Sequence, residues 1–136
     1  VSQQNGVVHN IIAKGERILL IEDDSVIREM VKKMLLNLGY NVKSFEKVKD
    51  AKEYAVNCEK IDLLITDVVM PEMNGRELSD SLSKTCPGLK TLFMSGYTAN
   101  VIAHRGVLDE GVNFIQKPFS IKELGKKIRL ILDLNS

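Results

Sequence analysis

The chain has 136 residues, 44% of them hydrophobic, which suits one globular domain with its own core. Lys and Arg number 19 against 18 Asp and Glu, and the resulting formal net charge of +1 gives no reason to expect nucleic acid or an anionic membrane as a partner. No apolar run approaches the roughly 18 to 20 residues that a membrane span needs, and no signal peptide is recognisable.

The first 16 residues, VSQQNGVVHNIIAKGE, form a polar segment that begins with Val1 and not with Met. This is typical of a piece of a longer protein, so we expect a linker over 1–16 and one domain over 17–136. Cys58 and Cys86 lack metal or redox spacing and are interpreted as incidental thiols. The expected location is the cytoplasm, although a longer parent chain can still be anchored in a membrane.

Along the first half of the chain, short apolar runs alternate with segments of helical period. RILLI (17–21) predicts a buried strand, and 25–39 predicts a helix that ends at Gly39, a favourable residue after a helix C-terminus. A weaker strand at 40–45, a short helix at 48–57 and a buried strand at 62–66 follow. On the first helix, the apolar residues share one helical face: Val26, Ile27, Met30, Val31, Met34, Leu35 and Leu38.

The second half continues the same alternation. It predicts, in chain order, a turn at 70–75, a helix at 76–84, a strand at 89–94, a weak helix at 98–107, a strand at 112–116 and a helix at 120–134. The last helix follows a Ser120 N-cap with Glu123 three residues later, the pattern of a capping box. The charges of KELGKKIR within it are interpreted as a solvated helix face.

A strand followed by a helix, repeated five times, predicts an α/β fold: a doubly wound parallel sheet with helices on both faces. Ligands bind such sheets at the carboxyl ends of the strands, where the strand order reverses. Every predicted strand except the second ends in polar groups that can take part in chemistry. These are Glu22-Asp23-Asp24 after the first strand, Asp67 after the third, Ser95 after the fourth and Lys117 after the fifth. Placing the second strand at the edge gives the order 2-1-3-4-5, with the reversal between Glu22-Asp23 and Asp67.

The adjacent carboxylates of Glu22, Asp23 and Asp24 repel one another at the end of a buried strand. Together with Asp67 they form an oxygen-rich site suited to a hard divalent cation, Mg²⁺ or Mn²⁺. Asp24 by itself is better explained as a helix N-cap than as a ligand. A cation beside Asp67, with the Lys117 ammonium and the Ser95 hydroxyl nearby, is arranged for phosphoryl transfer to a carboxylate.

Four segments, LLIEDDS, LLITDVVMPEMNG, LFMSG and QKPF, resemble the signature segments of the receiver domain of two-component response regulators. They occur in the family's order across 17 to about 134. The resemblance implies a flavodoxin-like (βα)₅ receiver fold. It also implies phosphorelay signalling, with a histidine kinase or a phosphotransfer protein as the phosphoryl donor. For the oligomeric state, the sequence leaves a homodimer open.

The resemblance also implies roles for individual residues. Asp67 would be the phosphoacceptor, Asp23 a direct metal ligand and Glu22 a ligand acting through water. The remaining implied roles are a main-chain carbonyl ligand at Val69, a cation for the phosphoryl oxygens at Lys117, a switch made of Ser95 and Phe114, and a cis-proline at Pro118. Phosphorylation would then change the surface around the fourth and fifth strands and the helix at 98–107.

The chain departs from common family patterns at several of these positions. Glu22 stands where Asp is also common, Ser95 stands in place of a frequent threonine, and Phe114 lacks the hydroxyl of tyrosine. Val69 and Tyr97 would flank the water that hydrolyses the phosphoryl group. Because both side chains are bulky, we expect slow self-dephosphorylation.

The longer pattern around these motifs is similar to receivers at the C-terminus of hybrid sensor histidine kinases. Two alternatives within the family are a stand-alone response regulator and a degenerate receiver that only binds proteins. Outside it, an aspartate-nucleophile phosphohydrolase would need a second Asp at Val69, and a flavodoxin-type carrier would need a phosphate-binding loop after the first strand. His9 and His104 have no paired acid and are interpreted as surface residues.

Overall fold

The structure, a computed structural model, describes residues 13–57, 60–68, 75–95 and 113–133. Several predictions fall outside these residues. They concern the turn at 70–75, the helix at 98–107, the carbonyl of Val69, Tyr97, Cys58, His9, His104 and most of the N-terminal segment.

The described elements follow the predicted alternation of strands and helices. They are β1 (Arg17–Ile21), α2 (Ser25–Asn37), β2 (Asn41–Phe45), α3 (Val48–Asn57), β3 (Leu63–Asp67), α4 (Gly75–Thr85), β4 (Lys90–Ser95), β5 (Phe114–Gln116) and α6 (Ile121–Asp133). In this part of the chain the strands form one five-stranded sheet of order β2-β1-β3-β4-β5, and each neighbouring pair is parallel. The predicted doubly wound α/β fold and its strand order are therefore confirmed.

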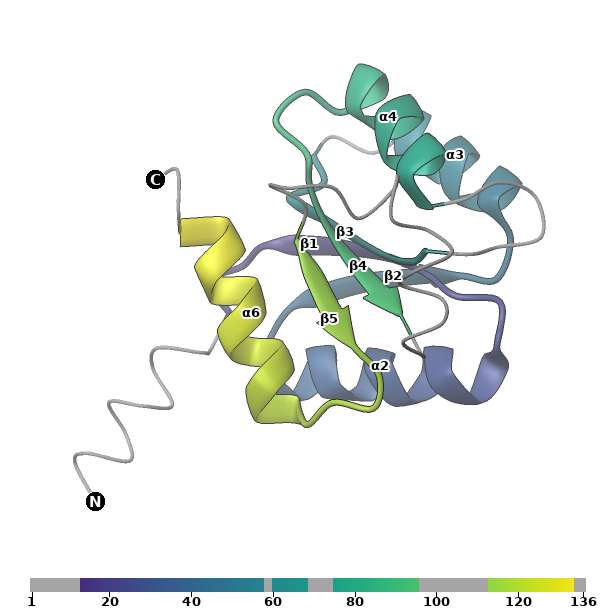
Figure 1. Cartoon of the computed structure of the whole chain (residues 1–136). Helices are drawn as coiled ribbons and strands as arrows, with labels where there is room; N and C mark the ends of the chain where they lie inside the picture. Colours follow the sequence, from purple (N-terminus) through teal and green to yellow (C-terminus); the bar gives the residue numbers. More distant parts are fainter. Residues whose placement is uncertain (1–12, 58–59, 69–74, 96–112, 134–136) are drawn as a thin grey trace.

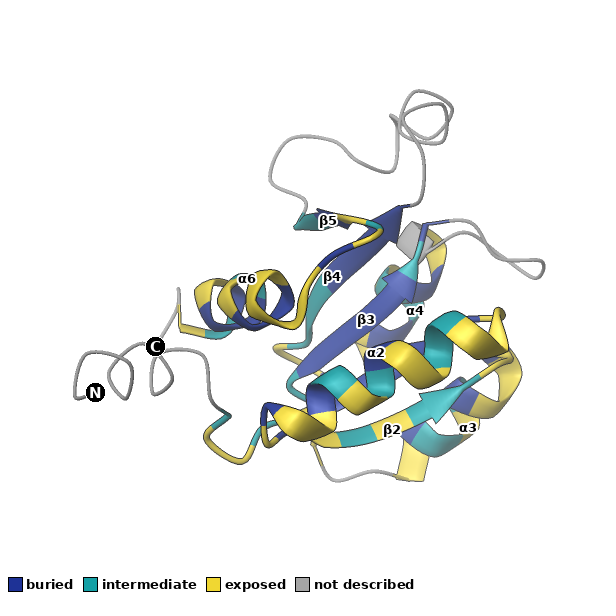
Figure 2. Cartoon of the chain, turned by 90° about the horizontal axis from the view of Figure 1, so that it is seen from below, coloured by how far each residue is buried: buried dark blue, intermediate teal, exposed yellow. Residues whose placement is uncertain are grey.

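The helices cover the two faces of the sheet in pairs (Figure 1). Alternate side chains of β1 point to opposite faces, so Ile18 and Leu20 pack with α2 and α6, whereas Leu19 and Ile21 pack with α3 and α4. Figure 2 shows β3 and β4 buried in the middle of the molecule and the edge strand β2 partly exposed. This burial explains why β3 is almost continuously apolar.

Helix α2 has well-defined ends. The Asp24 Oδ1 atom accepts hydrogen bonds from the N–H groups of Val26 and Ile27 at 2.9 and 3.1 Å, which confirms Asp24 as the N-cap. After the C-cap, Gly39 has φ of 93° and donates its N–H to the carbonyl of Leu36, while the N–H of Tyr40 reaches Leu35. This pair of bonds is the Schellman motif, and its left-handed residue is the Gly39 predicted from the sequence.

The predicted apolar face of α2 is only partly buried. Val31, Leu35 and Leu38 are buried, but Val26 is 76% exposed and Met30 is 40% exposed. Both exposed residues lie in the first half of the helix. They share the face without being buried, because an apolar stripe shows which residues can share a face but not how far the neighbouring elements cover it.

Helix α6 begins with the predicted capping box. The Glu123 N–H donates to Ser120 Oγ at 3.0 Å, and the Ser120 N–H donates to Glu123 Oε1 at 2.9 Å. The interpretation of its charges as one solvated face is wrong for Arg129, which is only 5% exposed. Its guanidinium bonds Glu16, Tyr40 and Asp133, so the cation is buried with partners.

The last residues of the predicted N-terminal segment contact the folded body. The Ala13 N–H donates to the carbonyl of Leu38 at 2.9 Å, and Glu16 bonds Arg129 at 2.8 Å. No helix within the described ranges is long and apolar enough to cross a membrane.

Candidate metal and phosphoryl-transfer site

The carboxyl end of β1 supplies the first two carboxylates of the site. Glu22 directly follows the strand, and its N–H still donates to the carbonyl of Phe45 at 3.1 Å, so the backbone pairing with β2 continues to this residue. Glu22 is 1% exposed, whereas Asp23 is exposed. The two residues therefore differ in environment, although they are adjacent in the chain.

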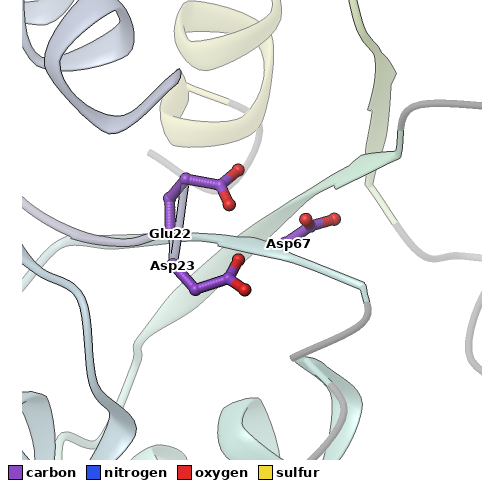
Figure 3. Close-up of side chains that lie close together, drawn as sticks. All are labelled: Glu22, Asp23 and Asp67. Atoms are coloured by element: carbon purple, nitrogen blue, oxygen red, sulfur yellow. The ribbon is translucent and has the colours of Figure 1, made fainter. Parts of the chain in front are cut away.

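The third carboxylate is Asp67, the last residue of β3, which lies beside β1 in the sheet. Figure 3 shows the side chains of Glu22, Asp23 and Asp67 gathered at these two strand ends. One oxygen from each carboxylate lies within 4.8 Å of the others. The structure thus brings together the residues that the sequence placed at the reversal of strand order.

Lys117 reaches this cluster from the residue after β5. Its Nζ atom lies 3.2 Å from Glu22 Oε1 and 3.3 Å from Asp67 Oδ2, and its side chain is 14% exposed. The Lys117 N–H also donates to the carbonyl of Ser95 at 2.7 Å. This bond continues the β4–β5 pairing and anchors the main chain from which the lysine side chain extends.

Burial and crowding of like charges shift the acids of the site toward protonation. Burial, followed by the neighbouring carboxyl groups of Asp23 and Asp67, raises the pKa of Glu22 to about 7. Burial also raises the pKa of Asp67, although Lys117 opposes the shift. Burial alone would lower the pKa of Lys117, but the carboxylates of Asp67 and Glu22 outweigh it and raise this pKa. A positive charge added beside Lys117, such as a bound cation, would favour the ionised forms of Glu22 and Asp67.

The chemistry of the donor set fits a hard divalent cation. Three carboxylates offer oxygens that are close enough to share one ion, and one of the three is exposed to solvent, which suits a cation that keeps bound waters. Glu22, Asp23 and Asp67 would hold the ion on the protein side, and the fourth predicted ligand, the carbonyl of Val69, lies outside the described residues. Asp24, engaged as the cap of α2, is outside this set.

The two predicted switch residues lie on β4 and β5. Ser95 is the last residue of β4 and is 1% exposed, and its hydroxyl has no hydrogen-bond partner within the described part of the chain. Phe114 is half-buried and pairs in register with Phe93 of β4. The Lys117–Pro118 peptide bond is cis, the geometry that the resemblance implies.

One contact at the site was missed by the sequence analysis. Arg28 Nη1 donates to the main-chain carbonyl of Glu22 at 2.8 Å. A signal for it is present in the sequence, because Arg28 follows the N-cap Asp24 by four residues and therefore lies one helical turn further along.

Comparison with models of protein families matches residues 18–129 to the response regulator receiver domain. The chain belongs to this family. The match spans the sheet, the carboxylate cluster and most of α6, so the family assignment and the geometry concern the same part of the molecule. The receiver domain is a module of two-component signalling, and the function predicted at this level is confirmed.

Curated relatives of this receiver domain occur both as short chains and as parts of long ones. This chain is 35% identical over 117 residues to the response regulator receiver protein CpdR of Brucella abortus, and the alignment covers 86% of this chain and 97% of the relative. It is 34% identical over 117 residues to the sensor kinase CckA of the same organism, covering 85% of this chain but only 12% of that protein. It is also 36% identical to the chemotaxis protein CheY1 of Helicobacter pylori.

Solved structures support the same fold. The receiver domain of the hybrid histidine kinase CckA is 30% identical, covers 85% of this chain and 98% of its own, and aligns with a TM-score of 0.63. The chemotaxis protein CheY4 of Vibrio cholerae is 25% identical, covers 87% of this chain and 99% of its own, and gives a TM-score of 0.74.

Proposed function

We propose that this receiver domain accepts a phosphoryl group on Asp67 in a reaction that depends on Mg²⁺ or Mn²⁺. The observation that carries the proposal is the convergence of Glu22, Asp23 and Asp67 around one point, with Lys117 bridging two of them. The donor would be a phosphorylated histidine of a kinase or of a phosphotransfer protein, as is general for receiver domains. With such a donor, the domain would act in the cytoplasm.

In the proposed step, a carboxylate oxygen of Asp67 attacks phosphorus, an O–P bond forms, and the P–N bond of the donor histidine breaks. The N–H group of the next residue, Val68, donates to Asp67 Oδ1 at 2.9 Å and helps to hold the carboxylate in position. The Lys117 ammonium, already 3.3 Å from Asp67 Oδ2, would stabilise the phosphoryl oxygens. The divalent cation supplies further positive charge against the same oxygens.

The proposed response to phosphorylation involves Ser95 and Phe114. The Ser95 hydroxyl is buried at the end of β4 and has no partner among the described residues, so it is available to bond a phosphoryl oxygen. Movement of this hydroxyl toward Asp67 would leave room for Phe114 to move inward, because the two residues lie on paired strands. The surface of β4, β5 and the chain between them would then change.

The experiment that tests this function is intact-mass measurement after incubation with acetyl phosphate and Mg²⁺. We expect one phosphoryl adduct on the wild type, its loss on addition of EDTA, and its absence from Asp67→Asn. A matched control is Asp50→Asn, which removes an exposed carboxylate from α3 and is expected to leave the adduct unchanged.

The outcomes separate the alternatives within the family. An adduct that persists in Asp67→Asn would assign the phosphoacceptor to another residue. A wild-type chain that binds Mg²⁺ but acquires no adduct would instead support a receiver that acts only by binding proteins. Adduct lifetime in the same samples tests the expected slow self-dephosphorylation, which a lifetime of a few seconds would contradict.

At a finer level, we propose that this receiver belongs to a hybrid sensor histidine kinase. The support is the resemblance to the receiver region of CckA, a sensor kinase in which the matched segment is 12% of the length. The stand-alone alternative has support of similar strength, because CpdR matches over 97% of its own length. An antibody raised against this domain distinguishes the two: a band far larger than the chain supports the hybrid kinase, and a band of its own size contradicts it.

A further inference from the structure

The loop between β1 and α2 carries two of the three clustered carboxylates, and most of its polar groups have defined partners. The Glu22 N–H bonds Phe45 at the end of β2, and the Asp24 N–H bonds the Glu22 carboxylate at 3.2 Å. The Asp24 carboxylate caps α2. These bonds fix the two ends of the loop but leave the peptide between Glu22 and Asp23 to be held by another group.

That group is Arg28. Its Nη1 atom donates to the Glu22 carbonyl at 2.8 Å, a length typical of a strong charge-assisted hydrogen bond. The Arg28 N–H bonds the carbonyl of Asp24 at 2.9 Å, so the arginine is part of the first turn of α2. The helix therefore reaches back to the loop through the side chain of Arg28.

The position of this carbonyl affects both carboxylates. The Glu22 carbonyl and the Asp23 N–H belong to one planar peptide group, so a donor that holds the oxygen fixes the plane from which both side chains depart. Both side chains depart from the Cα atoms at the two ends of this peptide, and one oxygen of each lies within 4.8 Å of the Asp67 carboxylate, so a rotation of the plane would move both away from that arrangement.

We propose that Arg28 is a positioning residue for the divalent-cation site, although it contributes no ligand atom. The proposal rests on the metal-dependent function inferred above and adds to it the group that orients two of the predicted ligands. Groups that orient metal ligands commonly change metal affinity by about tenfold or more when they are removed.

The charge of Arg28 acts in the opposite direction. A cation near three carboxylates weakens their attraction for a second cation, so loss of the charge alone would tighten Mg²⁺ binding. Loss of the hydrogen bond would weaken it. The sign of the change in affinity therefore distinguishes a positioning role from a general electrostatic one.

The test is an NMR titration of the domain with Mg²⁺ that follows the amide of Val68, whose N–H bonds Asp67. We expect the dissociation constant to rise about tenfold in Arg28→Met and to recover in part in Arg28→Lys, which keeps a donor and the charge. The matched control is Lys33→Met, which removes a positive charge from an exposed position of α2 and is expected to change the constant less than about twofold.

Several outcomes would overturn the proposal. Arg28→Met binding Mg²⁺ as tightly as the wild type, or more tightly, would show that the charge effect dominates. An equal loss in Lys33→Met would show that any cation on α2 has the same effect. If Arg28→Met does not fold, the titration of Arg28→Lys decides the question. The shorter lysine side chain should still weaken Mg²⁺ binding measurably.

These results are distinguishable from a failure of the proposed function itself. If the wild type shows no Mg²⁺-dependent shift at Val68, the metal site is absent and both proposals fail. If the wild type binds Mg²⁺ and Asp67 is phosphorylated, while Arg28→Met behaves like the wild type in the titration, only the role of Arg28 is refuted.

Discussion

At the scale of single residues, Glu22 combines near-complete burial with two carboxylate neighbours. Its carboxylate forms an ion pair with Lys117, 3.2 Å away, and that lysine also pairs with Asp67. Such an arrangement is unfavourable for folding without a bound cation and favourable for holding one. Functional sites commonly have this property, because binding requires groups that the fold alone would not place together.

We expect the metal-free domain to lose stability as the pH rises from 4.5 to about 7. Glu22 has a pKa of about 7 in the folded protein against 4.5 in the unfolded chain, so the folded state binds more protons in this range. Stability is therefore fully present below 4.5 and decreases toward 7, by at most about 3 kcal/mol for a shift of this size. Asp67, whose pKa is also raised by burial, acts in the same direction.

Urea unfolding in EDTA at pH 5 and at pH 8 measures this effect. Glu22→Gln removes the charge but keeps the size of the side chain, and it is expected to make the folding free energy less dependent on pH. A metal-free wild type that is more stable at pH 8 than at pH 5 would contradict the prediction.

At the scale of elements, α6 is joined to the amino end of the sheet by polar contacts of Arg129 and Lys90. Arg129 bonds Glu16, Tyr40 and Asp133, and Lys90 Nζ donates to the carbonyls of Ile131 and Leu132 at 3.2 and 3.1 Å. A lysine at these last carbonyls of α6 also complements the helix dipole. All these contacts lie at the edge opposite the carboxylate cluster.

Arg129→Met is expected to destabilise the domain by about 2–4 kcal/mol, because it leaves Glu16 and Tyr40 without their buried cationic partner. Chemical denaturation measures the loss. The control is Lys126→Met on the same helix, an exposed position where a change within about 0.5 kcal/mol is expected. Phosphorylation of the folded Arg129→Met protein should match the wild type, since the network is at the far edge of the sheet.

The start of α6 depends on the capping box. Ser120→Ala removes the acceptor for the Glu123 N–H and is expected to cost about 1 kcal/mol. Ser83→Ala is a suitable comparison, because its hydroxyl bonds a carbonyl within α4 and caps no helix start. Equal unfolding midpoints for the two variants in urea would show that the box adds no stability.

At the scale of the whole molecule, the doubly wound topology brings together residues that are far apart in the chain. Glu22 and Lys117 are 95 residues apart, yet they form an ion pair because β1 and β5 end at the same edge of the sheet. A cation held by Glu22, Asp23 and Asp67 would join residues that follow or end two different strands. Its binding is therefore coupled to the folding of the domain as a unit.

We expect Mg²⁺ to stabilise the whole domain by mass action. At a free concentration about ten times the dissociation constant, the gain is about 1.4 kcal/mol, and it should appear as a higher unfolding midpoint. Asp67→Asn should reduce the gain, and Asp50→Asn should retain it. A wild-type midpoint that responds to Mg²⁺ no more than to NaCl of equal ionic strength would refute the metal site.

The sequence by itself determined the order of strands and helices, because apolar period distinguishes buried strands from amphipathic helices in this chain. It also indicated the candidate site: if the four strands that end in polar groups are neighbours in a parallel sheet, Glu22 and Asp23 lie beside Asp67. The ends of α2 and α6 were equally predictable, since Asp24, Gly39 and Ser120 act through local backbone geometry.

Only the tertiary structure decided how far each face is covered and which charges are buried. Val26 and Met30 belong to the apolar stripe of α2 but remain exposed, and Arg129 looks like a surface charge but is buried among partners from distant segments. The hydrogen bond from Arg28 to the Glu22 carbonyl is local by comparison, but the sequence position of Arg28 alone does not show which acceptor its guanidinium reaches. Periodicity states which side chains share a face, whereas coverage and pairing depend on where the neighbouring elements pack.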